Sequence, residues 1–316
     1  ICQTGTAHRV IYLGHKDAVV EKVGITGGNR TTTASPRWLY PYKYVGSPGH
    51  SCGGGVFIPG YPERAGTLRE CRLFGNKYAG YWGGQLHAAG GLVDRCVIEG
   101  DDSMVNAANG GGVMLSGNAT IRSTLITGNR ASSCGGGVIV YYPARVRIIN
   151  CTIADNFITA TASSTDSGPG LYIAQSPENH PGRVEVVNTI IHGNHLSPAT
   201  PEPAEFTLAA NPDFFESQNS KAYVTIPFLN NLTSFDTTGY EADKLFSTNS
   251  LAADPLFKLS GSTPFKPVLN SPCVDNGVVE EWMYGAEDLI GRQRVAGASV
   301  DIGAYEKGLS TMLILR

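Results

Sequence analysis

The stretch SCGGGVIV at residues 133–140 joins three glycines to an apolar segment, and residues 51–58 repeat it closely as SCGGGVFI. A phosphate-binding P-loop carries Lys and then Ser or Thr after its glycines, because these side chains reach the phosphates and the metal. Apolar residues follow the glycines here instead. The duplication therefore indicates an internal repeat and not a nucleotide site.

A second phrase recurs after each glycine-led segment. Its copies are CRLFGN, CVIEGD, TLITGN, CTIADN and TIIHGN, at residues 71–76, 96–101, 124–129, 151–156 and 189–194. Such a period is typical of stacked architectures, whose units bury their apolar side against their neighbours. The units contain strand patterns without a helical pattern, and parallel crossovers are right-handed. We therefore predict an all-β fold, a single-stranded right-handed parallel β-helix (solenoid).

The repeat predicts where small residues stack inside the coils, about 4.8 Å apart from one coil to the next. Glycines are expected at the corners, because they accept positive φ and leave room for the adjacent coil. One buried column of small side chains is predicted from Cys71, Cys96, Thr124, Cys151 and Thr189, with disulfides or a metal site as the alternative for the thiols. A matching turn ladder is predicted from Asn76, Asp101, Asn129, Asn156 and Asn194.

Composition excludes some classes of partner. The net charge of −3 argues against a nucleic-acid-binding surface, which would need a strong basic excess. No apolar run approaches the roughly 20 residues of a membrane-spanning helix. The sequence starts at Ile1, and we expect a processed product of a longer precursor.

Four motifs near the end of the chain carry a family resemblance. They are ADPLF at 253–257, NSPCVDNG at 270–277, DLIGRQRV at 288–295 and VDIGAYE at 300–306. Together with the coils, they resemble secreted bacterial right-handed β-helix proteins of the pectate-lyase-like superfamily that end in a choice-of-anchor Q module. The resemblance implies export, to the extracellular space or the cell surface, but no shared catalytic residues. Ile290 departs from the family pattern, which has an acidic residue at this position.

Three regions are expected. Coils should occupy 1–194, a loop-rich excursion packed on the solenoid 195–250, and a C-terminal capping module 251–316. Residues 223–229 read as a strand within the excursion. In the module, Asp275, Asp288 and Asp301 lie among turn residues, and we expect their carboxylates to accept local backbone N–H groups.

Catalytic residues are not evident. A polysaccharide lyase needs a base beside a cation such as calcium, and a glycosidase needs two carboxylates. The candidate bases are Arg95, Arg122, Arg147, Lys22 and Lys77, and the carboxylates are Glu70, Asp94, Glu99 and Asp101. Histidine spacing indicates no metal centre, and we expect no cofactor, with calcium at Asp101, Asp102 or Asp155 as the alternative. Enzymatic activity stays open, and the sequence favours none.

One aromatic segment is a candidate binding surface. Residues 37–44 read RWLYPYKY, and the corresponding loop of the next coil reads KYAGYW at 77–82. The patch would consist of Trp38, Tyr40, Tyr42, Tyr44, Tyr78, Tyr81 and Trp82. Covering of a hydrophobic cluster, assembly contacts and sugar stacking are the three interpretations.

The sequence thus favours a secreted structural or adhesive surface protein that associates head to tail into a filament. Its partners would be other copies of itself or a polysaccharide. The alternatives are a carbohydrate-active enzyme, such as a pectate-lyase-like lyase or a glycosidase, and a non-catalytic glycan-binding protein.

Overall fold

The computed structural model of the chain describes residues 9–30, 53–78, 82–101, 107–143, 145–159, 168–173, 182–196, 214–216, 224–233 and 245–307. Strands dominate this part of the chain, and its helical elements are the short 3-10 turns η1 (Pro62–Arg64) and η4 (Glu281–Met283). The fold is therefore all-β, as predicted.

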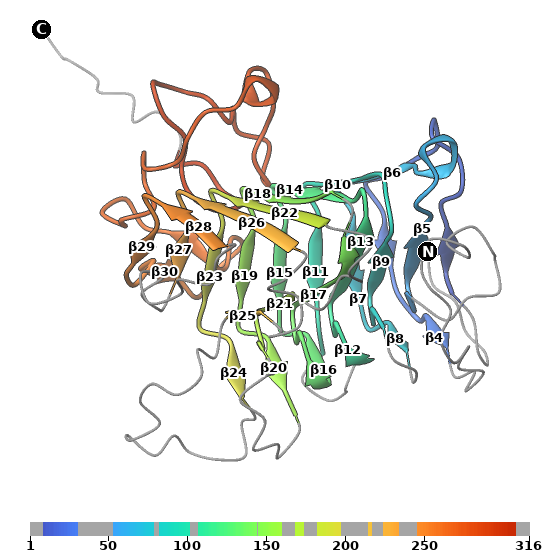
Figure 1. Cartoon of the computed structure of the whole chain (residues 1–316). Coiled ribbons are helices and arrows are strands. Elements are labelled where there is room, and N and C mark those ends of the chain that lie inside the picture. Colours follow the sequence, from blue (N-terminus) through green and yellow to red (C-terminus); the bar gives the residue numbers. More distant parts are fainter. Residues whose placement is uncertain are drawn as a thin grey trace, which may run out of the picture.

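Three long sheets form the body of the molecule, and each coil up to the one of β25 (Phe214–Glu216), β26 (Val224–Leu229) and β27 (Leu232–Thr233) contributes one strand to each of them (Figure 1). The first sheet contains β1 (Ile11–Tyr12), β5 (Val56–Ile58), β9 (Leu86–Ala88), β13 (Val113–Gly117), β17 (Val138–Pro143), β21 (Leu171–Ile173) and β25 (Phe214–Glu216). The second contains β2 (Val19–Glu21), β6 (Thr67–Arg69), β10 (Leu92–Asp94), β14 (Thr120–Arg122), β18 (Arg145–Ile149), β22 (Gly182–Val187), β26 (Val224–Leu229) and β28 (Leu245–Thr248).

The third sheet completes the coil. It contains β3 (Gly24–Ile25), β7 (Arg72–Phe74), β11 (Val97–Glu99), β15 (Leu125–Thr127), β19 (Thr152–Ala154), β23 (Ile190–His192), β27 (Leu232–Thr233) and β29 (Leu251–Ala252). Short fourth strands add β4 (Asn29–Arg30) beside β8 (Lys77–Tyr78), and β12 (Ala107–Asn109), β16 (Arg130–Cys134), β20 (Phe157–Ile158) and β24 (His195–Leu196). All of these neighbours pair in parallel, which identifies the solenoid as a parallel β-helix.

The core lies inside the coils, because the middle residue of most strands in the second and third sheets points inward. Leu68 pairs with Val93 and Val93 with Ile121, so that apolar side chains stack on one another along the solenoid axis. These side chains have no exposed surface. Stacking of this kind buries an apolar column without any helix to cover the sheets.

The glycines of the motif at residues 133–140 lie at the corner before the first sheet, where they allow positive φ and close approach of the next coil, as predicted. Gly135 has φ +63°, in the left-handed region that favours glycine. A Cβ added to Gly136 would lie 2.4 Å from the carbonyl oxygen of Phe157 on the next coil. Any side chain at this position would push the coils apart.

The region expected as an excursion contains strands of the solenoid. Within 195–250, β25, β26, β27 and β28 continue the three sheets, and β26 covers the segment expected to be a strand. The coil pattern is hard to recognise here, because the strands are separated by longer segments and lack the glycine-led phrase.

The remaining described residues, 253–307, form an irregular unit that we call the C-terminal module. It contains an antiparallel ribbon of β30 (Phe257–Lys258) and β31 (Lys266–Pro267), the turn η4 and many tight turns. Its contacts reach back along the side of the solenoid, since Arg294 bonds to Ser123 and the backbone amide of Ala304 to Thr152. Figure 1 shows part of the module above the strands β18, β22 and β26, and β30 beside β27 and β29 at the end of the solenoid. Capping of the last coil by this module stays a prediction.

Candidate functional site: the charged flank and the C-terminal module

A row of alternating charges runs along the outer face of the second sheet. Glu21, Arg69, Asp94 and Arg122 are the last residues of four successive strands and pair in register. Arg122 Nε lies 2.8 Å from Asp94 Oδ1, and Arg69 Nε lies 3.6 Å from Asp94 Oδ2. Opposite charges on neighbouring strands stabilise the pairing. We call this row, together with Arg95 and Arg147 beside it, the charged flank.

The same strand position becomes apolar on the following coils, and the C-terminal module covers it there. Ile149 and Val187 continue the row after Arg122. They form one buried cluster with Met283 and Val300 of the module. The change from charged to apolar residues thus marks where the module begins to cover the sheet.

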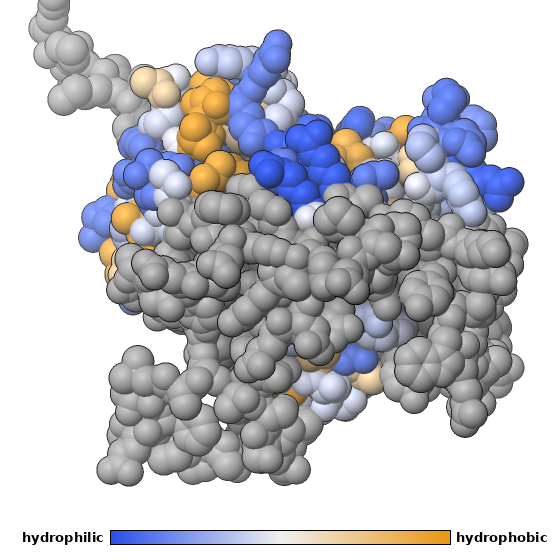
Figure 2. Space-filling view, viewed as in Figure 1, coloured by the Kyte–Doolittle hydropathy of each residue, from blue (hydrophilic) through white to orange (hydrophobic). Residues whose placement is uncertain are grey.

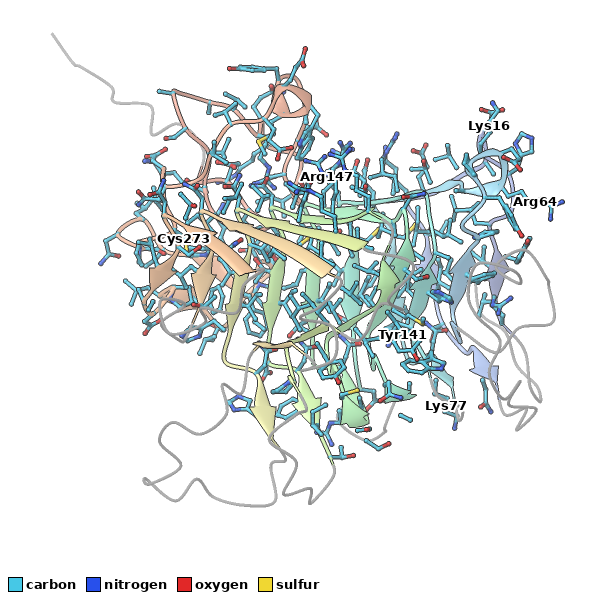
Figure 3. All side chains as sticks on the ribbon, viewed as in Figure 1. Lys16, Arg64, Lys77, Tyr141, Arg147 and Cys273 are labelled. Atoms are coloured by element: carbon cyan, nitrogen blue, oxygen red, sulfur yellow. The ribbon has the colours of Figure 1, made fainter. Side chains whose placement is uncertain are left out.

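Charged contacts at the edge of this cluster join the module to the flank. Arg147 Nη2 lies 2.9 Å from Glu280 Oε2, and Arg95 forms an ion pair with Glu287. The Arg122 guanidinium lies over the ring of Trp282, 4.2 Å from its centroid. Figure 2 shows strongly hydrophilic residues gathered along this edge of the molecule, and Figure 3 labels Arg147 there.

Each of the three candidate arginine bases is also bound by carboxylates of the coils. Arg95 Nη2 lies 2.6 Å from Glu70 Oε1, and Arg147 Nε lies 2.7 Å from Glu185 Oε2. Burial lowers the pKa of Arg147, but hydrogen bonds to Glu185 and Glu280 outweigh it and raise the pKa overall. A permanently charged, hydrogen-bonded guanidinium cannot accept a proton from a substrate.

Of the other candidate groups, Lys22, Glu70 and Asp94 lie with Arg95 at the charged flank. Lys22 lies 3.7 Å from Glu70, whereas Lys77 lies at the opposite edge of the molecule from Arg147 (Figure 3). Glu99 bonds to Arg72 on the preceding coil, and Asp101 is exposed. Of the four carboxylates, Glu70 and Asp94 are brought together by Arg95, and both are held in ion pairs with arginines.

The predicted column of small residues is continuous in the structure. Cys71, Cys96, Thr124, Cys151 and Thr189 are buried at equivalent positions of successive coils. The Cys96 amide donates to Thr124 Oγ1 at 3.2 Å, and the Cys151 amide to Thr189 Oγ1 at 3.4 Å. The column continues to Asn231 and Ser250, which the sequence reading missed because the repeat phrase is absent there. The described cysteines of the column carry free thiols.

Cys71 and Cys96 interact directly. A hydrogen bond from Cys96 is the main cause that lowers the pKa of the Cys71 thiol to about 7. Burial raises the pKa of Cys96 well above its usual value. Both thiols also donate to backbone carbonyl oxygens, Cys71 to Arg69 at 3.1 Å and Cys96 to Asp94 at 3.4 Å.

The predicted turn ladder is buried at four of its five positions. Asn129 Nδ2 donates to Asn156 Oδ1 at 3.1 Å, and Asn156 Nδ2 donates to Asn194 Oδ1 at 2.9 Å. Asp101 departs from the ladder, because burying an ionised carboxylate is costly. The amide of Gln85 takes this place, accepting from Asn76 Nδ2 at 2.7 Å and donating to the Glu99 carbonyl at 2.6 Å.

The module is held together by buried charged groups. Arg294 is fully buried and donates to Glu306 at 2.7 Å, to Ser123 Oγ at 3.0 Å and to two carbonyl oxygens. Asp288 accepts the backbone amides of Ile290 and Arg292. Asp301 accepts the amides of Asp275 and Lys307. The predicted local capping is thus confirmed for Asp288, whereas Asp301 joins separate segments of the module and the Asp275 carboxylate pairs with Lys307.

One histidine of the first sheet, His87 on β9, is buried. His87 Nε2 lies 3.0 Å from Ser116 Oγ, while its Nδ1 is buried without a hydrogen-bond partner. Burial lowers the pKa of His87 to about 3, with a further contribution from the charge of Arg9. The ring is therefore neutral.

Most of the predicted aromatic patch lies outside the described residues. This holds for Trp38, Tyr40, Tyr42, Tyr44 and Tyr81, and for the side chain of Tyr78. Trp82 packs against Tyr141, with ring centroids 4.4 Å apart, beside the buried Met114 and Ile139. Trp82 thus takes part in a hydrophobic cluster on the outer face of the first sheet.

The described residues contain no group of three or more His, Cys, Asp or Glu side chains that could hold a metal ion. Of the calcium candidates, Asp155 lies 3.7 Å from His195, and Asp102 lies outside the described residues. No helix within the described part of the chain is long and apolar enough to cross a membrane.

Comparison with known proteins agrees with the coil geometry. No curated protein matches the sequence. Residues 49–199 match a family model described as a right-handed beta helix region. This match and the parallel sheets together show that the chain folds as a right-handed parallel β-helix.

Proposed function

We propose that this β-helix is a structural or adhesive protein at the exterior of the cell, in which the coils serve as a rigid scaffold. The observation that carries the proposal is the charged flank. Its arginines are engaged by carboxylates of the coils and of the C-terminal module. Such a face stabilises the docking of the module and leaves no proton acceptor for lyase chemistry at Arg95 or Arg147.

Two further features support the proposal. The buried amide ladder joins successive coils by side-chain hydrogen bonds, which favours a stiff rod over a mobile array. The motifs of residues 253–306 resemble the closing module of exported surface β-helix proteins. Export is an expectation from this resemblance.

A turnover assay tests the scaffold role against the lyase alternative. The purified chain is incubated with a panel of uronate polymers, with and without calcium ions, and absorbance of unsaturated uronates is followed. We expect no product. Turnover that disappears in the Arg147→Gln variant would overturn the proposal, because it would assign the flank a catalytic role.

The proposal includes end-to-end association. The strands β3 and β29 lie at opposite edges of the third sheet, and an edge strand can pair with a strand of another chain. Light scattering over a concentration series should therefore show a mass that grows with concentration, and electron microscopy should show rods of variable length. A mass that remains that of one chain at high concentration would contradict association.

A further inference from the structure

The C-terminal module contains an open cavity of about 350 Å³, which is lined mainly by cationic and aliphatic side chains. Four cationic side chains and several aliphatic ones surround it, and none of the described lining residues is acidic. We call this the cationic cavity, and its lining includes Lys258, Lys266, Arg292, Lys307, Leu269 and Ile290.

Two of the cations lie opposite each other on the ribbon. Lys258 pairs directly with Lys266 across β30 and β31. Like charges at directly opposed positions destabilise an antiparallel pair. An anion between the two ammonium groups would remove this repulsion.

Counter-charges within the protein are scarce for these cations. Of the four, only Lys307 forms an ion pair among the described residues, with Asp275 at 2.7 Å. Lys266 Nζ donates to the carbonyl oxygen of Glu306 at 2.6 Å, and Arg292 to the carbonyl oxygen of Lys307 at 2.6 Å. Carbonyl oxygens satisfy the donors without neutralising the charge.

The nearest buried carboxylates are occupied elsewhere. Asp288 accepts backbone amides of residues 290, 292 and 306, and Asp301 accepts those of 275 and 307. These bonds hold both carboxylates within the turns of the module. Burial lowers the pKa of Lys266, and the charge of Arg292 lowers it further, although Asp288, Asp301 and Glu306 oppose these effects.

Exposed aliphatic side chains belong to the lining of the cationic cavity or directly follow it in the chain. Leu269 in its wall is 70% exposed, and Leu259, next to Lys258, is 75% exposed. Ile290 adds a further 41% exposed side chain. Large apolar side chains in water beside cations are typical of surfaces that bind the interface of a membrane. Figure 2 shows hydrophobic residues on the module beside strongly hydrophilic ones.

We propose that the cationic cavity and its leucines dock on a membrane surface that contains anionic phospholipid. The phosphate groups would lie between the cations, and Leu259 and Leu269 would enter the interface. A sugar is a poorer fit, because the described lining offers one hydroxyl, on Thr263, and no aromatic ring. A small free anion would not bury the exposed side chains of Leu259 and Leu269.

Vesicle sedimentation tests the proposal on the whole chain. Vesicles of phosphatidylcholine alone are compared with vesicles that also contain phosphatidylglycerol. We expect at least tenfold tighter binding to the anionic vesicles. The Lys258→Gln/Lys266→Gln variant should bind about 30-fold more weakly, since a cation near an anionic surface contributes about fivefold in affinity.

The matched control removes two cations at the far end of the solenoid. Lys16 and Arg64 lie at the N-terminal coils (Figure 3), so the Lys16→Gln/Arg64→Gln variant should bind anionic vesicles as the unaltered chain does. The Leu259→Ser/Leu269→Ser variant should bind more weakly at every salt concentration. An equal loss in the matched control would overturn the proposal, because it would indicate attraction by overall charge.

A labelling experiment on the unaltered chain makes the test independent of variant folding. Anionic vesicles should protect Lys258, Lys266 and Lys307 from an amine-reactive reagent and leave Lys16 reactive. Equal binding to both kinds of vesicle, or complete displacement by millimolar inorganic phosphate, would overturn the proposal. Binding of an acidic polysaccharide in the absence of any vesicle binding would overturn it as well.

Discussion

At the residue scale, the corner between the second and third sheets has an unusual backbone. One residue per coil adopts positive φ there, and the later coils use Asn150, Asn188, Asn230 and Asn249. The earlier coils use less suitable residues, which are Lys22, Glu70, Arg95 and Ser123. Asparagine tolerates the left-handed region, whereas long side chains pay a steric cost of about 1 kcal/mol or more.

Lys22→Asn should therefore stabilise the protein. Lys22 has φ +56°, and its contact with Glu70 is long and exposed, so little is lost with the charge. We expect the free energy of unfolding to rise by about 0.5 to 1 kcal/mol in a denaturant titration. Lys22→Ala is the control and should give no gain, since alanine does not favour this conformation. A gain of equal size in both variants would contradict the backbone explanation.

His87 predicts a loss of stability in acid. Its pKa is about 3 in the folded protein and near 6.5 in an unfolded chain, so the unfolded state binds more protons between these values. The contribution of the neutral ring is present above pH 6.5 and is lost as the pH falls towards 3, by up to roughly 4 kcal/mol.

The His87→Gln variant removes this titration and keeps a polar group beside Ser116. Unfolding curves measured from pH 7 to pH 4 should fall less steeply for this variant than for the unaltered chain. His15→Gln is the control, because His15 is exposed, and it should leave the slope unchanged. Parallel curves for His87→Gln and the unaltered chain would show that His87 is not buried as a neutral group.

At the element scale, the amide ladder holds the coils together at the end of the third sheet. Asn156 receives the Asn129 side chain, donates to Asn194 and also binds the carbonyl oxygens of Ile126 and Ala154. Asn156→Ala would leave several of these buried groups without partners.

We expect Asn156→Ala to lower the free energy of unfolding by about 2 to 4 kcal/mol. The control is Asp101→Ala, at the equivalent sequence position but exposed, and its effect should stay within about 0.5 kcal/mol. Equal effects of the two substitutions, measured by thermal or chemical unfolding, would mean that the ladder is not a buried network.

The elements also show what the sequence could and could not predict. The ladders followed from periodicity alone, since equivalent positions of a parallel coil must stack. Gln85 was missed because it fills a gap in the ladder from a different strand position. After residue 194 the sequence predicted the strand at 223–229, but the other described strands up to residue 250 were missed because their separations and residues no longer follow the repeat.

At the scale of the whole molecule, the coils and the C-terminal module form one packed structure. Arg95 and Glu287 are 192 positions apart in the chain and meet at the flank. Periodicity carries no information on where an irregular segment docks, so the sequence could not predict this contact. The apolar positions Ile149 and Val187 were the available signal, because outward-facing apolar residues on a charged row require a cover.

A double-mutant cycle across Arg147 and Glu280 tests the docking of the module on the charged flank most directly. The free energy of unfolding is measured for Arg147→Gln, Glu280→Gln and the double variant. Docking as described, with these side chains 2.9 Å apart, predicts a coupling free energy of about 0.5 to 1.5 kcal/mol. Additive effects of the two substitutions, with no measurable coupling, would contradict the account.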